Sequence, residues 1–193
     1  MPKIVDHQVR RRELAQAVVE VASKRSLDHA SLRAVAQQAG MSMGTVQHYF
    51  EDRKAMLDFV LEYTQQQRTE RIERAVVALA TPTPTSILGA VVDEILTVDE
   101  TNLMFEQVNM MFINRAHRDP DTATRLGRGR AEVVQLFTGL FHDLTLRDGL
   151  TPEIASEILW ALLEDLPIAI TLGQHTSQSA RAVAHSYLKH IIE

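Results

Sequence analysis

The chain has 193 residues, 45% of them hydrophobic and 23% charged, which is enough for one or two domains with a buried core. It contains no cysteine, and this excludes disulfides, thiolate metal sites and cysteine nucleophiles and fits a reducing cytoplasm. The formal net charge of −5 would disfavour nucleic acid as a partner if the charge were evenly spread.

The charge is instead divided along the chain. Residues 1–50 hold seven Lys and Arg against four Asp and Glu, a net charge of +3. Residues 51–193 hold thirteen against twenty-one, a net charge of −8. A basic N-terminal module can neutralise phosphates, and an acidic remainder is repelled by them. The densest basic cluster, the three arginines at 10–12, fits either a phosphate-contacting arm or a solvated helix start.

No export or membrane segment is expected. The N-terminus, MPKIVDHQVRRR, lacks the apolar stretch of a signal peptide. The longest uncharged run, residues 75–92, contains Pro82 and Pro84, which is typical of a helix end, a loop and a new helix. We therefore expect a cytoplasmic protein.

Two helices are predicted before residue 40. The first, residues 8–24, should pack across the helices that follow, and the second begins at Ser31, whose hydroxyl can accept an orphan backbone N–H. Gly40 can take the left-handed conformation that commonly ends a helix. The apolar stripes are Leu14, Val18, Val21 and Ala22 in the first helix, and Leu32, Val35, Ala36 and Ala39 in the second.

A third helix is predicted from Ser42, as its N-cap, to about Phe50. It is apolar only at Val46, Tyr49 and Phe50. The other positions are small or hydrogen-bonding, as a surface in a DNA major groove has to be. These are Met43, Gly44, Thr45, Gln47 and His48. Two short helices around a glycine also occur in ordinary all-α cores, so the spacing alone leaves that alternative open.

The run AGMSMGTVQHYF, followed by Arg53 and Met56, resembles the DNA-binding domain of the TetR family of bacterial transcriptional regulators over roughly residues 11–61. The resemblance implies an all-α fold with a helix-turn-helix domain over residues 1–50 and a regulatory and dimerisation domain over residues 51–193. It also implies a homodimer that binds a palindromic operator and is released by a small-molecule effector. The matching positions are Ser31, Ala36, Ala39, Gly40, Ser42, Gly44, Tyr49 and Phe50.

Three positions depart from the family pattern. Gln47 replaces the usual tyrosine, and a glutamine can pair bidentately with an adenine edge. Arg53 replaces the usual lysine and adds a planar fork for phosphate. Ser26 stands where a glycine commonly ends the first helix, so that cap is expected to lack a left-handed residue.

The expected DNA contacts follow from these residues. We predict that Gln47 and Thr45 read base edges and that Gly44 lets the backbone come close. Phosphate contacts are predicted for Ser31, Arg33, Tyr49, Arg53 and Lys54. The whole predicted DNA surface is Ser31, Arg33, Ser42, Met43, Gly44, Thr45, Gln47, His48, Tyr49, Arg53 and Lys54.

Helices without strands are predicted for the rest of the chain. A long helix over residues 52–79 connects the two modules, so a tilt at its far end on ligand binding would move the recognition helix. Pro120 and Pro152 stand at plausible first helical positions. The GRGR segment at 127–130 is a weak match to an RNA-binding tract and more typical of a local helix interruption. The further helices are predicted over residues 85–98, 100–117, 119–146, 152–172 and 179–192.

Two long apolar stripes are predicted to serve both the core and a dimer interface. Burial within one chain is the alternative. Pro167 lies inside the second stripe and should kink its helix. The stripes are Val133, Leu136, Phe137, Leu140 and Phe141, and then Ile158, Leu162, Leu166 and Ile170.

A ligand pocket is predicted around the segment LMFEQVNMMF, residues 103–112, because methionine and aromatic side chains suit adaptable apolar pockets. An ordinary core is the alternative. Glu164 could face a cationic ligand or form a surface ion pair. The other predicted lining residues are Phe105, Val108, Asn109, Phe112 and Trp160.

An enzyme is not indicated, because the sequence has no phosphate-binding glycine loop and none of the common nucleophile or metal-binding motifs. His185 and His190 are five residues apart and share a helix face poorly. No metal or cofactor is expected. An all-α ligand-binding or interaction protein without DNA-binding activity is the remaining alternative.

Overall fold

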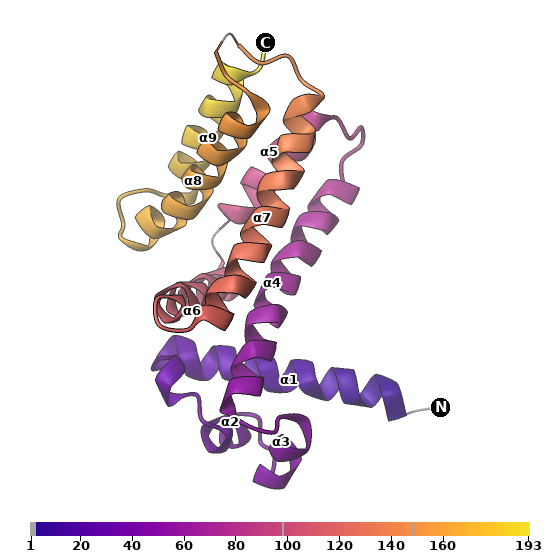
Figure 1. Cartoon of the computed structure of the whole chain (residues 1–193), viewed down its shortest axis with the longest axis vertical. Coiled ribbons are helices and arrows are strands. Elements are labelled where there is room, and N and C mark those ends of the chain that lie inside the picture. The colour runs from indigo at the N-terminus through magenta and orange to yellow at the C-terminus, as the bar shows by residue number, and fades with distance from the viewer. Residues whose placement is uncertain (1–2, 98, 148) are drawn as a thin grey trace. The chain divides into compact units, whose positions relative to one another are not determined.

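The computed structural model describes residues 3–97, 99–147 and 149–193, with the side chains of 3–6, 100 and 101 left out. The fold is all-α, and the described residues contain no strand, only an isolated bridge between Leu146 and Ile192 (Figure 1). The helices are α1 Lys3–Lys24, α2 Leu32–Gln38, α3 Met43–Tyr49, α4 Arg53–Val77, α5 Pro84–Ile95, α6 Glu100–Ala116, α7 Pro120–His142, α8 Pro152–Thr171 and α9 Ser177–Ile191, with a short 3₁₀ turn, η1, at Leu27–His29.

Contacts divide the chain into two compact units. The first unit contains residues 1–67 and 99–124, and the second contains residues 68–98 and 125–193. The module predicted at residues 1–50 therefore lies within a larger first unit, which also holds the start of α4 and the whole of α6. Helices α4 and α7 each contribute residues to both units.

The first unit is built around α1, which packs against η1, α2 and α6. Leu14 and Val18 of α1 are fully buried, as their place in the predicted stripe indicates. Val46 anchors α3, and Phe50 lies at its C-terminal cap with 1% of its surface exposed. The start of α4 completes this core with Met56, Leu57, Val60 and Leu61.

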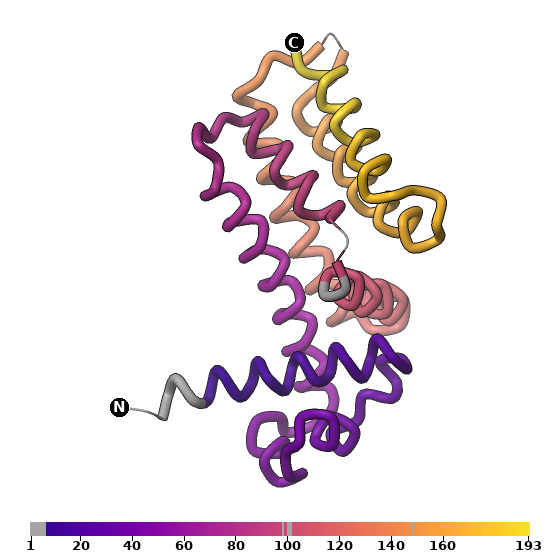
Figure 2. The backbone as a smooth tube through the Cα atoms, turned by 180° about the vertical axis from the view of Figure 1, so that it is seen from behind, coloured from indigo at the N-terminus to yellow at the C-terminus, as the bar shows by residue number. Residues whose placement is uncertain are grey.

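The second unit has a core formed by α5, α7, α8 and α9. Helices α8 and α9 run side by side as a hairpin (Figure 2). Their turn closes at Gly173, which has φ 72° and donates its N–H to the carbonyl of Ile170. Ala180 and Ala184 are fully buried, and such small side chains let the helices approach closely. The largest fully buried side chains of this core are Phe137, Phe141, Leu88, Leu96 and Leu159.

Several predicted helix starts were wrong. Helix α1 begins at Lys3, five residues before the predicted start. Helix α9 begins at Ser177, because a capping box joins the Thr176 hydroxyl to the backbone N–H of Ser179. Helix α5 begins at Pro84 behind the same kind of box, formed by Thr83 and its partner Ser86.

Other predicted ends also need correction. Helix α7 ends at His142 and not at residue 146, because the chain then extends to meet its C-terminal residues. There the N–H of Arg147 donates to the carbonyl of Ile191, and that of Glu193 to the carbonyl of Thr145. Helix α7 also continues through the GRGR segment, where Arg130 forms an ion pair with Glu157. No described helix is long and apolar enough to cross a bilayer.

Candidate nucleic-acid interface

The turn between α2 and α3 has the hydrogen bonds of a Schellman cap. The N–H of Met41 donates to the carbonyl of Ala36 at 2.9 Å, and the N–H of Gly40 donates to that of Gln37 at 3.3 Å. This pattern needs a left-handed residue, and Gly40 has φ 65°. The predicted glycine turn is confirmed, and it fixes the direction in which α3 leaves α2.

Both helices have the predicted N-caps. The Ser31 hydroxyl accepts the N–H of Ala34 at 3.2 Å, and the Ser42 hydroxyl accepts that of Thr45 at 3.1 Å. The Thr45 hydroxyl also lies 2.8 Å from the Ser42 hydroxyl. Two residues predicted to contact DNA therefore also hold the first turn of α3 in place.

Helix α3 has one buried side and one exposed side. Val46 is fully buried, while Met43, Gly44, Gln47 and His48 are exposed. The buried side chain attaches the helix to the unit, and the exposed positions are those that the sequence assigns to DNA. A short helix held by its inner face can present its outer face to a major groove.

An aromatic cluster flanks the end of α3. The ring of His7, from α1, lies 4.6 Å from that of Tyr49 and 6.1 Å from that of His48. His7 was missed in the sequence because the first helix was predicted to start after it. Only the tertiary contact, and no local pattern, places it beside α3.

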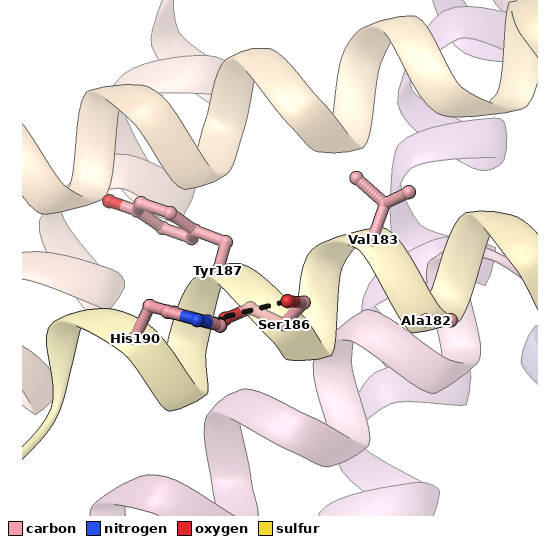
Figure 3. Close-up of a pocket in the computed structure, with 5 residues that line it drawn as sticks. All are labelled: Ala182, Val183, Ser186, Tyr187 and His190. Carbon is pink, nitrogen blue, oxygen red and sulfur yellow. Dashed lines mark hydrogen bonds between the residues drawn. The ribbon is translucent and has the colours of Figure 1, made fainter.

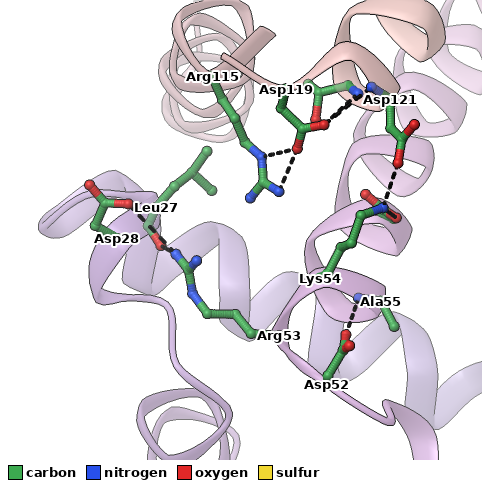
Figure 4. Close-up of polar contacts among 11 residues, drawn as sticks. Leu27, Asp28, Asp52, Arg53, Lys54, Ala55, Arg115, Asp119 and Asp121 are labelled. Carbon is green, nitrogen blue, oxygen red and sulfur yellow. Dashed lines mark hydrogen bonds and ion pairs between the residues drawn. The ribbon is translucent and has the colours of Figure 1, made fainter.

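Arg53 binds the backbone of the segment that precedes α2 (Figure 4). Its Nη2 donates to the carbonyl of Leu27 at 2.6 Å and its Nε to that of Ala30 at 3.1 Å. The Asp28 carboxylate lies 3.8 Å from the same Nη2 atom of Arg53. Two of the three guanidinium nitrogens thus have a structural role in addition to the predicted phosphate contact.

Lys54 bonds with two carboxylates. Its Nζ lies 3.0 Å from the Asp58 carboxylate and 3.1 Å from that of Asp121, and these bonds raise the lysine pKa. Next to this group, Arg115 donates two hydrogen bonds to Asp119 and lowers the pKa of that carboxyl to about 2 (Figure 4). The side chain of Lys54 is half exposed.

The three arginines at 10–12 do not act as one patch. Arg11 places its guanidinium 4.1 Å from the centre of the Phe59 ring and 5.7 Å from that of Phe50, so it packs against the core. Arg10 pairs with Glu13 at 2.7 Å. Arg12 is exposed. Arg11 is therefore not part of a phosphate-contacting arm, which was one of the two interpretations of this cluster.

The residues predicted to line a pocket fall in different units. Phe105, Val108 and Phe112 are buried in the first unit, where Asn109 is partly buried. Trp160 is buried in the second unit, and its Nε1 has no hydrogen-bond partner among the described residues. The remaining predicted residue, Glu164, is exposed in the second unit.

The residues predicted for a dimer interface are divided between core and surface. Leu136 and Ile158 are exposed. Phe137, Phe141 and Leu166 are buried in the core of their own unit, so they are not available to a partner. The others, Val133, Leu140, Leu162 and Ile170, pack partly against that core.

Further exposed apolar residues of the same unit, which were not predicted, include Ile154 of α8 and Val183 of α9. Val183 lines a shallow hollow on α9 together with Tyr187 and His190 (Figure 3). The Tyr187 hydroxyl donates to the carbonyl of Ala155, and burial raises the pKa of this tyrosine to about 12.

His185 and His190 each contact a group within the second unit. His185 lies 2.8 Å from the Asp93 carboxylate, and His190 lies 2.6 Å from the carbonyl of Ser186. Within the described ranges, no group of three histidine or acidic side chains has the arrangement of metal ligands.

A capped helix, a left-handed glycine turn and a second helix with a polar outer face define a helix-turn-helix DNA-binding regulator. The family model described as bacterial regulatory proteins, tetR family, matches residues 14–60. Over these residues the chain is similar to the TetR family.

Two relatives illustrate the similarity. The transcriptional regulator PksA of Bacillus subtilis is 27% identical over 169 residues, which cover 87% of this chain and 82% of PksA. The regulator BetI of Stenotrophomonas maltophilia is 27% identical over 191 residues, which cover 97% of this chain and 95% of BetI. Both relatives are HTH-type transcriptional regulators.

Solved structures share the fold. A transcriptional regulator from Rhodococcus has a TM-score of 0.80 and 23% identity, over 94% of this chain and 95% of its own. A regulator from Saccharomonospora viridis in complex with choline has a TM-score of 0.85 and 16% identity, over 96% of this chain and 99% of its own. The regulator FadR of Bacillus subtilis in complex with stearoyl-CoA has a TM-score of 0.72 and 16% identity, over 92% of this chain and 95% of its own.

Proposed function

We propose that this protein is a repressor that binds a palindromic operator as a dimer and leaves it when a small molecule binds. The observation that carries the proposal is the outer face of α3, which is polar and exposed while Val46 and Phe50 hold the helix from inside.

Gly44 supports this role for α3. A Cβ built on Gly44 would meet only the Ser42 hydroxyl, at 3.9 Å, and the backbone φ is not positive. The fold therefore does not require a glycine here, although a glycine inside a helix costs about 1 kcal/mol relative to alanine. The absence of a side chain at Gly44 is explained if a DNA backbone or base edge approaches the helix closely at this position.

Gln47 is the proposed base reader, and its replacement is the first test. We expect Gln47→Ala to lower affinity for a selected operator by about 1–3 kcal/mol and to relax preference at one base position. Arg53→Ala should weaken binding to all sequences alike and reduce the salt slope by about one. Operator selection followed by titration of single-base variants measures both effects.

Arg53→Lys is the matched control for this test. It keeps the positive charge but cannot reach both the Leu27 and Ala30 carbonyls with one nitrogen in the geometry of the guanidinium. If Arg53 acts through its charge, this variant should keep the affinity for DNA. If Arg53 acts through its bonds to the two carbonyls, the variant should lose affinity as Arg53→Ala does. If Gln47→Ala weakened all sequences equally, as Arg53→Ala does, the reader role of Gln47 would be wrong.

The proposed dimer surface consists of four exposed apolar residues. Leu136 of α7 and Ile158 of α8 were predicted from the sequence, and the structure adds Ile154 of α8 and Val183 of α9. These four are among six exposed large apolar side chains in the described part of this unit, and a contiguous exposed apolar patch is typical of an interaction surface. A palindromic operator needs two reading helices about 34–36 Å apart, or a multiple of that, and a dimer supplies them.

The proposed effector contacts Trp160. This buried indole N–H lacks a partner among the described residues, and such a donor is normally satisfied, so an acceptor on a small molecule could complete it. The Saccharomonospora and FadR structures hold choline and stearoyl-CoA. Both molecules carry oxygen acceptors, which makes them reasonable first probes for this chain.

Trp160 is the only tryptophan of the chain, so its fluorescence reports on this contact. We expect every small molecule that releases the protein from its operator to change the Trp160 emission, and molecules without effect on binding to leave it unchanged. A panel that begins with choline and stearoyl-CoA, scored for both properties, makes the measurement. A molecule that released the operator with the Trp160 emission unchanged would contradict the assignment.

A further inference from the structure

Lys54 lies between two carboxylates that come from different helices of the first unit. Asp58 is one turn further along α4, so its contact with Lys54 is local. Asp121 belongs to the first turn of α7, far away in the sequence, and still lies 3.1 Å from the Lys54 ammonium (Figure 4). The fold therefore brings a second carboxylate to this lysine.

The position of Asp121 is fixed by the corner between α6 and α7. The Asp119 carboxylate accepts the backbone N–H groups of Asp121 at 3.2 Å and of Thr122 at 3.3 Å. Arg115 holds the other oxygen of Asp119 with two hydrogen bonds of 2.9 and 2.7 Å. Because the corner is tied in this way, Asp121 moves only when the start of α7 moves.

The stability of α4 does not explain Lys54. The positive end of the helix dipole lies at the N-terminus, so a lysine in the first turn is unfavourable there. The acidic cap of this turn is Asp52, whose carboxylate accepts the N–H of Ala55 at 2.7 Å. Lys54 is half exposed and lies next to Arg53, at the end of the segment that leads from α3 into α4.

We propose that Asp121 competes with a DNA phosphate for Lys54, so that the corner between α6 and α7 sets how strongly the first unit holds DNA. The inference rests on the proposed DNA-binding function. Two carboxylates neutralise the ammonium and engage two of its three donors, so a phosphate gains little from Lys54 while Asp121 stays in place. Coupling of this kind is reciprocal, and bound phosphate also weakens the Lys54–Asp121 contact.

Asp121→Asn tests the competition. Exposed ion pairs contribute about 0.2–1 kcal/mol, and the upper value corresponds to about a fivefold change in affinity. We therefore expect about 1.4- to fivefold tighter binding, and a salt slope steeper by about one because Lys54 gains a phosphate. A phosphate contact carries no sequence information, so the gain should be equal for the selected operator and a scrambled duplex.

Three control variants separate this effect from a general change of charge. In a Lys54→Gln background, Asp121→Asn should leave affinity unchanged, because the competed lysine is absent. Asp121→Glu should bind like the wild type. Glu51→Gln removes a carboxylate from another exposed position of the same unit and should give a smaller gain than Asp121→Asn. Thermal unfolding of each variant establishes that it is folded before titration.

An unchanged or weakened affinity of Asp121→Asn would overturn the inference. An equal gain in the Lys54→Gln background would do the same, because the effect would then not pass through Lys54. If these results came with normal wild-type binding, only the competition would be wrong. If the wild type bound neither duplex, the DNA-binding proposal would fail together with the competition.

Discussion

Phe50→Ala is expected to destabilise the first unit by about 3–5 kcal/mol and to abolish operator binding. Phe50 is 1% exposed, caps α3 and lies 5.6 Å from the Phe59 ring. Its removal leaves a cavity beneath the recognition helix and takes away one side of the packing around Arg11. Urea unfolding followed by circular dichroism measures the loss.

Phe50→Leu is the conservative control, and we expect it to retain part of the stability and part of the DNA binding. Phe141→Ala is the control in the second unit, where it removes an equally buried ring at a distance from α3 in the sequence. An unfolding midpoint of Phe50→Ala equal to that of the wild type would show that α3 is not held by this residue.

Ile158→Glu is expected to convert the proposed dimer into monomers and to weaken binding to a palindromic operator by at least about 100-fold. Ile158 is 38% exposed on α8, and a buried unpaired carboxylate at a helix interface is strongly unfavourable. Linking two reading heads raises avidity by about 10²–10⁴, and this gain is lost in a monomer. Analytical ultracentrifugation and operator titration measure the two effects.

Val77→Glu is the control for this variant, because Val77 is an exposed apolar residue at the end of α4 and lies outside the proposed surface. It should leave both the sedimentation and the affinity unchanged. A dimer that persisted in Ile158→Glu, with unchanged operator binding, would place the interface elsewhere.

The local architecture of the helix-turn-helix could be predicted because its signals are close together in the sequence. Ser31 and Ser42 cap helices that begin at the next residue, and Gly40 supplies the left-handed turn. Each of these contacts joins residues at most a few positions apart. Periodic apolar residues likewise identified the buried face of α1.

The parts that could not be predicted depend on contacts between distant residues. No local pattern shows that Arg11 packs on Phe59, or that Arg53 binds the carbonyls of Leu27 and Ala30. The division into units has the same cause, because α6 joins the first unit by packing against α1. The start of α1 was missed because the apolar stripe that identified this helix begins only at Leu14.

The predicted pocket illustrates the same limit for function. Methionine and aromatic residues in α6 have the composition of a pocket, but Phe105, Val108 and Phe112 are buried side chains of the first unit. Trp160 differs from them because its indole nitrogen is buried without a partner among the described residues. Composition identifies an apolar segment, whereas an unsatisfied donor identifies one atom for a ligand to bind.

Binding of the wild-type protein to the DNA upstream of its own coding sequence tests the central claim most directly. In a gel-shift or anisotropy titration, we expect tight binding to one duplex from this region, and weaker, salt-dependent binding to a scrambled duplex of the same length. Gln47→Ala should reduce the difference in affinity between the bound duplex and the scrambled duplex. Failure to bind any duplex, with the protein folded, would contradict the account and favour an all-α ligand-binding or interaction protein.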